Sequence, residues 1–422
     1  MSDLFLRNGR VLDVVSGRYL VNHDVLVKQG RIAAVGRGLQ APDVPAVDLT
    51  GRTVLPGLID CHVHVLAVTA DLASLHTAAP MYVAAQAAGL MRDMLARGFT
   101  TVRDNAGADW GLAQAQLDGL LAGPRIFYCG RALSQTGGHG DARRRGQHVI
   151  DEHPCCPVPT RVADGVDGVR RAAREELRHG AHHIKIMVSG GVASPTDEVE
   201  AIQYSLEEIR AVVEEAEAAN RYVSAHAYPG RAISRALRCG VRSIEHGNLL
   251  DDESLSLLVE HRAFLTPTLT TYWALKEEGP RWGLPPVSHA KVDAVLDAGL
   301  DALDRAYQAG VKLCYGTDLL GGMQRHQLRE FQIRVQVQPA IEVIRSATTY
   351  AAELLRRPGE IGVVAEGAHA DLVVVDGDPL ADISVLNPPG GVQPAVVQGG
   401  RLVAGHLPDL PGADLPGTDP TG

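Results

Sequence analysis

Two histidines two residues apart close an apolar run near residue 60, where Asp60-Cys61-His62-Val63-His64 follows Leu58-Ile59. Side chains two positions apart on an extended strand point to the same face, so His62 and His64 are expected on one side. Two neutral imidazole nitrogens at that spacing can bind one cation. The pair alone is more typical of two unrelated surface histidines, so a metal site needs further ligands.

Four further polar residues end or interrupt other apolar runs, and they are Lys185, His226, His246 and Asp318. Taken singly, each is typical of a structural polar residue at the end of a strand. Imidazole nitrogens and carboxylate oxygens are ligands for Zn²⁺ and related ions, whereas a lysine ammonium has no lone pair to offer. With His62 and His64 they predict one site, provided that the fold brings all six to the same place.

The middle of the chain supplies the elements that could do this, because eight short apolar runs alternate with helical patterns. The predicted strands are 58–62, 100–102, 126–128, 183–187, 222–226, 243–246, 263–265 and 312–315. The predicted helices are 81–97, 166–179, 205–219, 291–309 and 339–355. Eight strand-then-helix units predict an α/β fold, a parallel (β/α)₈ TIM barrel whose strands end at one mouth. A doubly wound sheet is the alternative, but no G-x-G-x-x-G sequence follows the first strand.

Both ends of the chain have β patterns. We expect residues 1–56 and 366–405 to form one small β-sandwich domain around a barrel of residues 57–365, since chain ends often lie close together. The pairs Asn8-Gly9, Gln29-Gly30 and Gly399-Gly400 predict hairpin turns. Residues 406–422 are rich in Pro, Gly and Asp, which predicts a flexible tail.

Composition excludes several classes of protein. The 422 residues carry a formal charge of −10 without a basic cluster, which argues against nucleic-acid binding. No apolar run approaches the ~18 residues that would span a membrane, and the first residues do not resemble a secretory signal. Six scattered cysteines without a C-x-x-C pair predict free thiols in a reducing compartment. We therefore expect a cytoplasmic protein.

The ligand set and its order along the chain resemble the amidohydrolase superfamily of metal-dependent hydrolases. The matching pieces are Pro56-Gly57-Leu58-Ile59-Asp60-Cys61-His62-Val63-His64, Lys185, His226, His246 and Asp318. The resemblance covers nearly the whole chain and implies two divalent cations, most simply Zn²⁺, with Mn²⁺, Co²⁺ or Fe²⁺ as alternatives.

The resemblance also implies a role for each ligand. His62, His64 and Asp318 would hold the more buried cation, and His226 and His246 the more exposed one. Lys185, carboxylated by CO₂, would bridge the two. A hydroxide between the cations would attack the amide, and Asp318 would pass the proton to the leaving nitrogen.

Within the superfamily, the chain is most similar to the Xaa-Pro dipeptidase-like, or prolidase-like, branch, which also includes ochratoxin-hydrolysing amidases. Residues 130–139, 189–197 and 316–321 carry that similarity. It implies a small-molecule dipeptide or N-acyl amino acid substrate and a homo-oligomer. His139 would bind the oxyanion and Tyr228 the substrate carboxylate, although a solvated loop histidine and a packing aromatic are equally simple interpretations.

Other functions remain open at this stage. A xenobiotic amidase, carbamate hydrolase or urea hydrolase would use the same metal pair. A mononuclear deaminase would lack a bridging lysine, so Lys185 weighs against it. A scaffold protein would have lost ligands that are all present here.

Several nearby residues receive weaker predictions. Residues 103–105 could support the metal ligands or form a plain ion pair. Glu245 is expected to point away from the site, since it neighbours His246 on a strand. His182-His183 precedes its strand and is not expected to bind metal. The excursion 140–162, which contains Cys155-Cys156, is long enough to be a lid.

Overall fold

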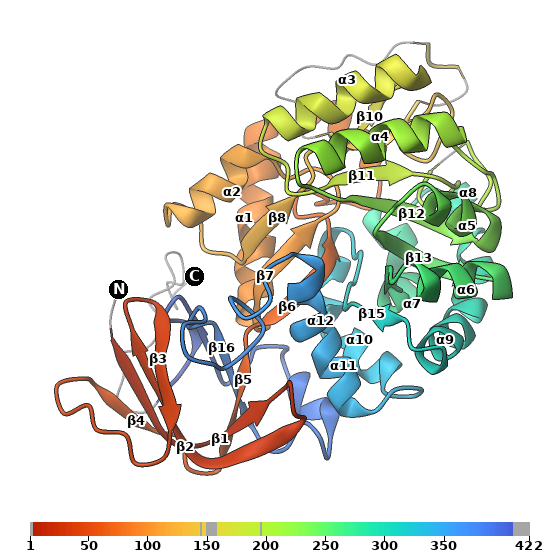
Figure 1. Cartoon of the computed structure of the whole chain (residues 1–422). Helices are drawn as coiled ribbons and strands as arrows, with labels where there is room; N and C mark the ends of the chain where they lie inside the picture. The colour runs from red at the N-terminus through yellow and green to blue at the C-terminus, as the bar shows by residue number, and fades with distance from the viewer. Residues whose placement is uncertain (1–2, 144–145, 149–157, 195, 408–422) are drawn as a thin grey trace.

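The computed structural model describes residues 3–143, 146–148, 158–194 and 196–407. A barrel of strands and helices forms one part of the molecule, and a sheet built from both chain ends lies beside it (Figure 1). The Cys155-Cys156 pair and all but the first two residues of the predicted tail lie outside the described residues. Among the described residues, no helix is long and apolar enough to cross a membrane.

All eight predicted barrel strands are present, and neighbouring strands run parallel. They are β6 (Leu58–Val63), β7 (Phe99–Asp104), β8 (Arg125–Tyr128) with its continuation β9 (Ala132–Ser134), β11 (Ile184–Met187), β12 (Val223–Pro229), β13 (Ser243–Leu249), β14 (Phe264–Thr266) and β15 (Lys312–Leu313). The Cys61 amide donates to the Tyr315 carbonyl at 2.7 Å, which joins the first strand to the last. The fold is therefore the predicted (β/α)₈ barrel.

Helices cover the outside of the barrel, and the predicted helix over 205–219 begins with a capping box formed by Ser205 and Glu208. They are α1 (Pro80–Ala96), α2 (Trp110–Leu117), α3 (Gly165–Arg178), α4 (Leu206–Ala218), α5 (Gly230–Arg238), α6 (Asp252–Glu260), α7 (Leu269–Glu278), α8 (Pro286–His289), α9 (Val292–Gln308), α10 (Arg329–Arg334), α11 (Ala340–Ser346) and α12 (Thr349–Leu354). Short 3₁₀ turns are η1 (Leu72–His76), η2 (Gly279–Trp282), η3 (Gly321–His326) and η4 (Ile383–Leu386).

The single long helix predicted over 339–355 is wrong, because the chain breaks into α11 and α12 between Ser346 and Thr349. The Ser346 carbonyl accepts from Tyr315 at 2.9 Å, and the Ala347 carbonyl accepts from Ile59 at 2.8 Å. Two carbonyls that satisfy the barrel strands are not available to the next helical turn. Periodicity alone does not reveal this competition.

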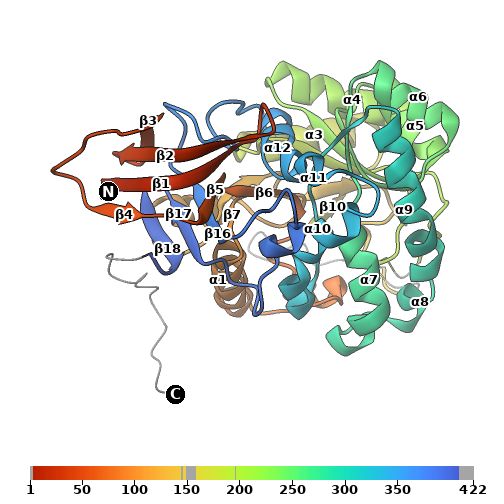
Figure 2. The same cartoon turned by 90° about the horizontal axis from the view of Figure 1, so that it is seen from below.

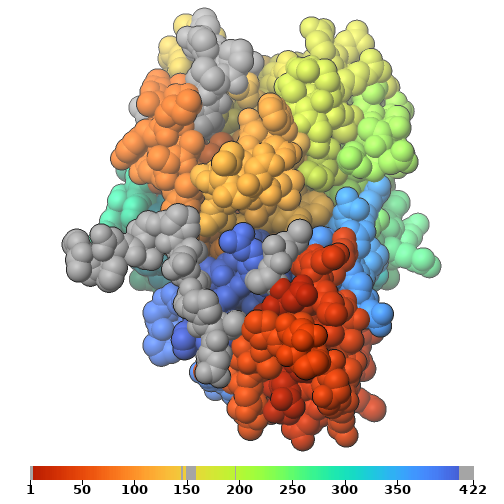
Figure 3. Space-filling view, turned by 90° about the vertical axis from the view of Figure 1, so that its left-hand side faces the viewer, coloured from red at the N-terminus to blue at the C-terminus, as the bar shows by residue number. Residues whose placement is uncertain are grey.

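The chain ends form one eight-stranded sheet with mostly antiparallel pairs. Its strands are β1 (Leu4–Asp13), β2 (Arg18–Lys28), β3 (Arg31–Gly36), β4 (Ala46–Asp48), β5 (Arg52–Pro56), β16 (Leu372–Asp376), β17 (Ala395–Gln398) and β18 (Arg401–Gly405). In hydrogen bonding these strands make one sheet and not two, with a shared apolar core. Figure 2 shows the N-terminal red strands beside the C-terminal blue ones, and in Figure 3 red and blue residues lie near one another on the same face.

The hairpins predicted at Gln29-Gly30 and Gly399-Gly400 are present, but the one at Asn8-Gly9 is not. Asn8 has the expected positive φ of 59°, and its amide donates to Asp24 at 3.0 Å. The result is a bulge inside the continuous strand β1, because one extra residue shifts the pairing register without reversing the chain.

Candidate metal centre

The six predicted ligands line one pocket at the C-terminal mouth of the barrel. His62 lies in β6 with His64 just beyond it, and Asp318 follows β15. Lys185, His226 and His246 lie in β11, β12 and β13. Parallel strands present their C-terminal ends at the same mouth, so segments more than 250 positions apart contribute to one site.

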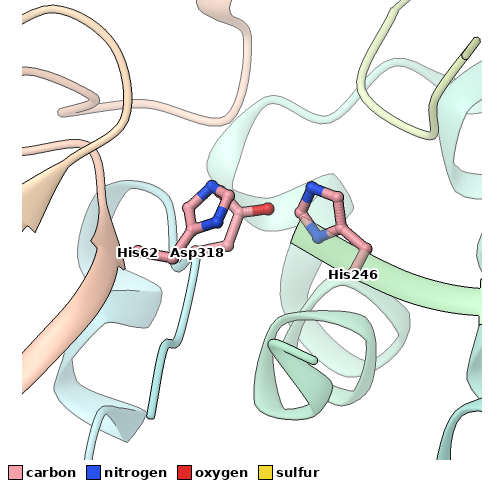
Figure 4. Close-up of side chains that lie close together, drawn as sticks. All are labelled: His62, His246 and Asp318. Atoms are coloured by element: carbon pink, nitrogen blue, oxygen red, sulfur yellow. The ribbon is translucent and has the colours of Figure 1, made fainter. Parts of the chain in front are cut away.

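Asp318 lies between the two histidines of the H-x-H pair. Its Oδ1 is 3.0 Å from His64 Nε2 and 3.5 Å from His62 Nε2. One ligand atom from each of His62, His246 and Asp318 lies within 4.8 Å of the others, and Figure 4 shows these side chains pointing toward a common space. A nitrogen and oxygen donor set of this kind fits a divalent cation such as Zn²⁺.

The second pair of histidines lies beside the first. The His226 and His246 ring centroids are 4.6 Å apart, and the His62 and His246 centroids are 5.0 Å apart. Burial lowers the pKa of His62, His226 and His246 well below the usual value, and neighbouring cationic groups add to the effect. Their rings are therefore neutral near pH 7, which is the form that binds metals.

Each histidine has one ring nitrogen held by a protein group outside the predicted ligand set. The held pairs are His62 Nδ1 with Glu245 Oε2 at 2.8 Å, His64 Nδ1 with the Ala106 carbonyl at 3.0 Å, His226 Nε2 with the Gly190 carbonyl at 3.0 Å, and His246 Nδ1 with Thr268 Oγ1 at 2.8 Å. Such partners fix the ring orientation and are typical of metal-binding histidines. This arrangement fits the divalent cations that the sequence implies.

The structure corrects the prediction for Glu245. Its side chain is completely buried and contacts His62, so it points into the barrel beneath the site. The next residue, His246, has a φ of 77°, which breaks the alternation of an extended strand. Both side chains can then serve the same site. Gly247 follows with a φ of 67°. A glycine at this position is a feature of the sequence that indicates irregular backbone.

Glu245 is itself held by Arg103, and both side chains have zero exposure. Arg103 Nη2 lies 2.7 Å and 2.8 Å from the two Glu245 oxygens, and Ser243 Oγ donates to Oε1 at 2.7 Å. Burial alone would raise the pKa of Glu245, but the Arg103 charge, the Lys185 charge and the Ser243 hydrogen bond together outweigh burial and lower the pKa. Arg103 thus forms an ion pair with Glu245, and Glu245 in turn orients the predicted ligand His62. Both interpretations that the sequence left open, an ion pair and support for the metal ligands, therefore apply to Arg103.

A second buried carboxylate holds the backbone of both the first and the last strand. Asp60 accepts the His62 amide at 3.0 Å, the Thr317 hydroxyl at 2.7 Å and the Gln327 side chain at 2.9 Å. Burial raises the pKa of Asp60 to about 6 despite these donors. Asp318, the residue after Thr317, adopts a positive φ of 51°. This local strain is typical of functional positions.

Among the described residues that line the pocket, Lys185 is the one lysine, and it is 1% exposed. Its Nζ makes no hydrogen bond or ion pair with any residue that the structure describes. Burial lowers the pKa of Lys185 to about 8, so the neutral amine is far more abundant near pH 7 than in a free lysine. An unpaired buried amine beside four histidines and a carboxylate is a chemically reactive group.

The two predicted substrate-binding residues lie beside the predicted ligands. The His139 ring stacks on His226 with centroids 4.2 Å apart, and the Tyr228 ring stacks on His246 at 5.1 Å. Burial has the largest effect on the pKa of each residue. It lowers the pKa of His139 and raises the pKa of Tyr228. His183 is buried, as expected for a residue outside the site, and bonds Asn105 at 3.2 Å.

The pocket wall contains residues that the sequence did not single out. Apolar side chains form much of it, and among them are Leu72, Val192, Tyr272, Leu275 and Leu320. Asp71 and His76 lie on the same wall at either end of η1. Ser194 also lines the pocket and contacts His139. Short loop segments of this kind have no periodic signal that predicts their direction.

Comparison with known proteins agrees with this geometry. The model of the amidohydrolase family matches residues 53–402. The chain is 34% identical to ochratoxinase from Aspergillus niger over 409 residues, which covers 92% of this chain and 84% of that protein.

Two solved structures are also similar. A prolidase complexed with N-methylphosphonate-L-proline has 52% identity and a TM-score of 0.93, covering 95% of this chain and 99% of that one. A Xaa-Pro dipeptidase with bound methionine has 30% identity and a TM-score of 0.83, covering 95% and 99%. The chain folds into the barrel, its histidines converge at one mouth, and the family model matches most of its length. It therefore belongs to the amidohydrolase family and is a hydrolase of amide or peptide bonds.

Proposed function

We propose that the protein is a binuclear metal-dependent amidohydrolase that cleaves the amide bond of a dipeptide or N-acyl amino acid, in the manner of a Xaa-Pro dipeptidase. The observation that carries this proposal is the buried Lys185 amine, which shares one pocket with four histidines and Asp318. A lone buried ammonium is costly. Conversion to a carbamate by CO₂ would give it two oxygens with which to bind cations.

The residues divide into two ligand sets around this lysine. His62, His64 and Asp318 would hold one cation, and His226 and His246 the other, with carboxylated Lys185 shared between them. When bound, such cations supply Lewis acidity that lowers the pKa of water and polarises a carbonyl. Zn²⁺ fits the nitrogen and oxygen donors, although Mn²⁺, Co²⁺ and Fe²⁺ fit the same set.

The chain's own groups would then move the proton and bind the substrate. The Asp318 carboxylate has its pKa lowered overall, because the nearby His62 and His64 outweigh the effect of burial. It is therefore ionised at neutral pH and can accept a proton from the attacking water and pass it to the leaving nitrogen. His139 and Tyr228 border the same space, where His139 would contact the oxyanion and Tyr228 the free carboxylate of the substrate.

Relatives support this substrate class. N-methylphosphonate-L-proline, bound by the 52% identical prolidase, carries a tetrahedral phosphorus next to a proline nitrogen. That shape resembles the tetrahedral state of an acyl-proline bond under attack. The apolar pocket wall suits an apolar acyl group or side chain on the other side of the bond.

An ochratoxin-type amidase is the second candidate, and the 34% identical ochratoxinase favours it. Both candidates would hydrolyse an amide next to a carboxylate-bearing residue. The same apolar wall would then receive the apolar part of that substrate.

A matched substrate panel tests the proposal. Zn²⁺-loaded protein is incubated with Xaa-Pro dipeptides, N-acyl amino acids varied at the C-terminal residue, and the amides of the same compounds, and release of the free amino acid is measured. We expect hydrolysis of the carboxylates and little of the amides. Turnover of aminated rings with about one metal per chain, measured by elemental analysis, would contradict the proposal in favour of a deaminase.

Three further expectations accompany this proposal and have their own measurements. Sedimentation would reveal the predicted homo-oligomer, and fractionation of cells would reveal the cytoplasmic location. Limited proteolysis would test the division into a barrel over 57–365 and a β domain from 1–56 and 366–405.

A further inference from the structure

We propose that Ser194 and Asp197, in the loop after β11, are positioning residues that fix which nitrogen of His139 faces the substrate. The expected effect on kcat rests on the proposed hydrolytic function. The expected protonation of the His139 ring does not. Ser194 lies on the pocket wall and Asp197 lies outside the pocket lining, and both contact His139. They would act through His139.

The three side chains form a chain of hydrogen bonds. Ser194 Oγ donates to Asp197 Oδ1, a short contact that leaves the serine oxygen free to accept. His139 Nδ1 lies 2.9 Å from that oxygen. Ser194 has one hydroxyl proton, and its other two neighbours, Asp197 Oδ1 and the Gly191 carbonyl at 3.2 Å, can only accept it. His139 Nδ1 is therefore the donor and carries the imidazole proton.

The opposite nitrogen of His139 is thereby directed into the pocket. His139 Nε2 makes no hydrogen bond with any residue in the described part of the chain, and the side chain lines the pocket beside His226. This pattern, with one nitrogen held by a carboxylate-backed donor and the other open, parallels what the structure shows for His62 and Glu245.

The loop itself is held in several independent ways. Gln203 accepts the His139 amide at 2.9 Å through Oε1 and donates to Asp197 Oδ2 at 2.9 Å through Nε2. Lys291 Nζ donates to the carbonyls of Gly191 at 3.0 Å and Ser194 at 2.9 Å. The Asp197 side chain is only 3% exposed, so its charge is not screened by water.

The His139 ring fits only against a residue without a side chain. A Cβ added to Gly191 would lie 2.2 Å from His139 Cε1 and 2.4 Å from Nδ1. The ring also stacks on His226 with an interplanar angle of 19°. Packing therefore limits tilting of the ring, while the Ser194 contact selects its protonated nitrogen. Two kinds of restraint on one side chain indicate that its direction matters for function.

Kinetics of a double-mutant cycle test the proposal. Ser194→Ala and Asp197→Asn are each expected to lower kcat about 10- to 100-fold with KM nearly unchanged, and Ser194→Thr to restore most of the loss. In a His139→Ala background, Ser194→Ala is expected to cause no further loss. Additive losses there would overturn the proposal, since they would mean that Ser194 acts without His139.

Thr136→Ala is the matched control. It removes a hydroxyl that donates to Asp164 at 2.6 Å, from the same loop as His139 but on the exposed side. It is expected to leave kcat unchanged. A loss equal to that of Ser194→Ala would mean that general loosening of the loop, and not the ring of His139, is responsible.

A spectroscopic measurement separates this inference from the proposed function. ¹⁵N-histidine NMR of the full-length protein, with the His139 signals assigned from His139→Gln, reports the tautomer whether or not any substrate is hydrolysed. We expect the Nδ1-protonated form in the wild type and a mixture in Ser194→Ala. An Nε2-protonated ring in the wild type, or identical spectra, would refute the positioning role. An inactive wild type with the expected spectra would refute only the hydrolase.

Discussion

Glu245→Gln removes a completely buried charge that supports the predicted metal site. A glutamine has one acceptor oxygen and one donor nitrogen, so it cannot accept from Arg103 and His62 as Glu245 does. Arg103 then remains as a buried cation with its anion removed. Breaking a fully buried ion pair in this way destabilises a protein by about 3–5 kcal/mol. Weaker orientation of His62 is expected to reduce metal affinity about 10- to 100-fold.

Urea unfolding of the metal-free protein measures the stability difference, and a Zn²⁺ titration with a competing chelator measures the affinity. Asp252→Asn is the matched control, because Asp252 pairs with Arg305 at 2.6 Å but is fully exposed. Its cost is expected to be about 0–1 kcal/mol. If Glu245→Gln unfolds at the same urea concentration as the wild type, the ion pair does not stabilise the barrel and the reasoning is wrong.

The difference between wild type and Glu245→Gln is also expected to depend on pH. The folded protein lowers the pKa of Glu245 from its ordinary 4.5. Its contribution is therefore fully present above the unfolded pKa and is lost as the pH falls through the folded one. The two proteins are expected to converge in stability only in acid below pH 4.5. Convergence already at pH 6 would contradict the assigned direction.

Three other substitutions and one reactivation experiment have defined outcomes. Lys185→Ala is expected to lose metal and activity together and to regain part of both with small carboxylic acids, as elemental analysis and turnover would show; unchanged turnover would exclude the bridge. Reactivation of the metal-free wild type by Zn²⁺ is expected to be faster when bicarbonate is present, and faster at pH 8.5 than at pH 6.5. The reason is that only the neutral amine of Lys185, whose pKa is about 8, reacts with CO₂. Asp318→Asn is expected to keep much of its metal while kcat falls about 10²- to 10⁴-fold, and full activity would remove Asp318 from the proton path. Gly191→Ala is expected to lower kcat because its Cβ overlaps the His139 ring, and a crystal structure would show that ring displaced.

The sequence by itself determined the barrel and the candidate ligands. Side-chain direction alternates with a period of two along a strand, so His62-Val63-His64 places both imidazoles on one face wherever the strand lies. Short apolar runs separated by helical patterns likewise indicate parallel strands, whose common polarity brings Lys185 and Asp318 to one mouth. These are local rules that need no knowledge of the partner segment.

Only the tertiary structure decided which groups support those ligands. Glu245 reaches His62 across 183 positions of the chain because His246 adopts a positive φ, and strand alternation predicted the opposite direction. The helix predicted over 339–355 breaks because distant strands take its carbonyls. Contacts between segments far apart in sequence compete with local preference, and their hydrogen bonds outweigh it once the groups are buried.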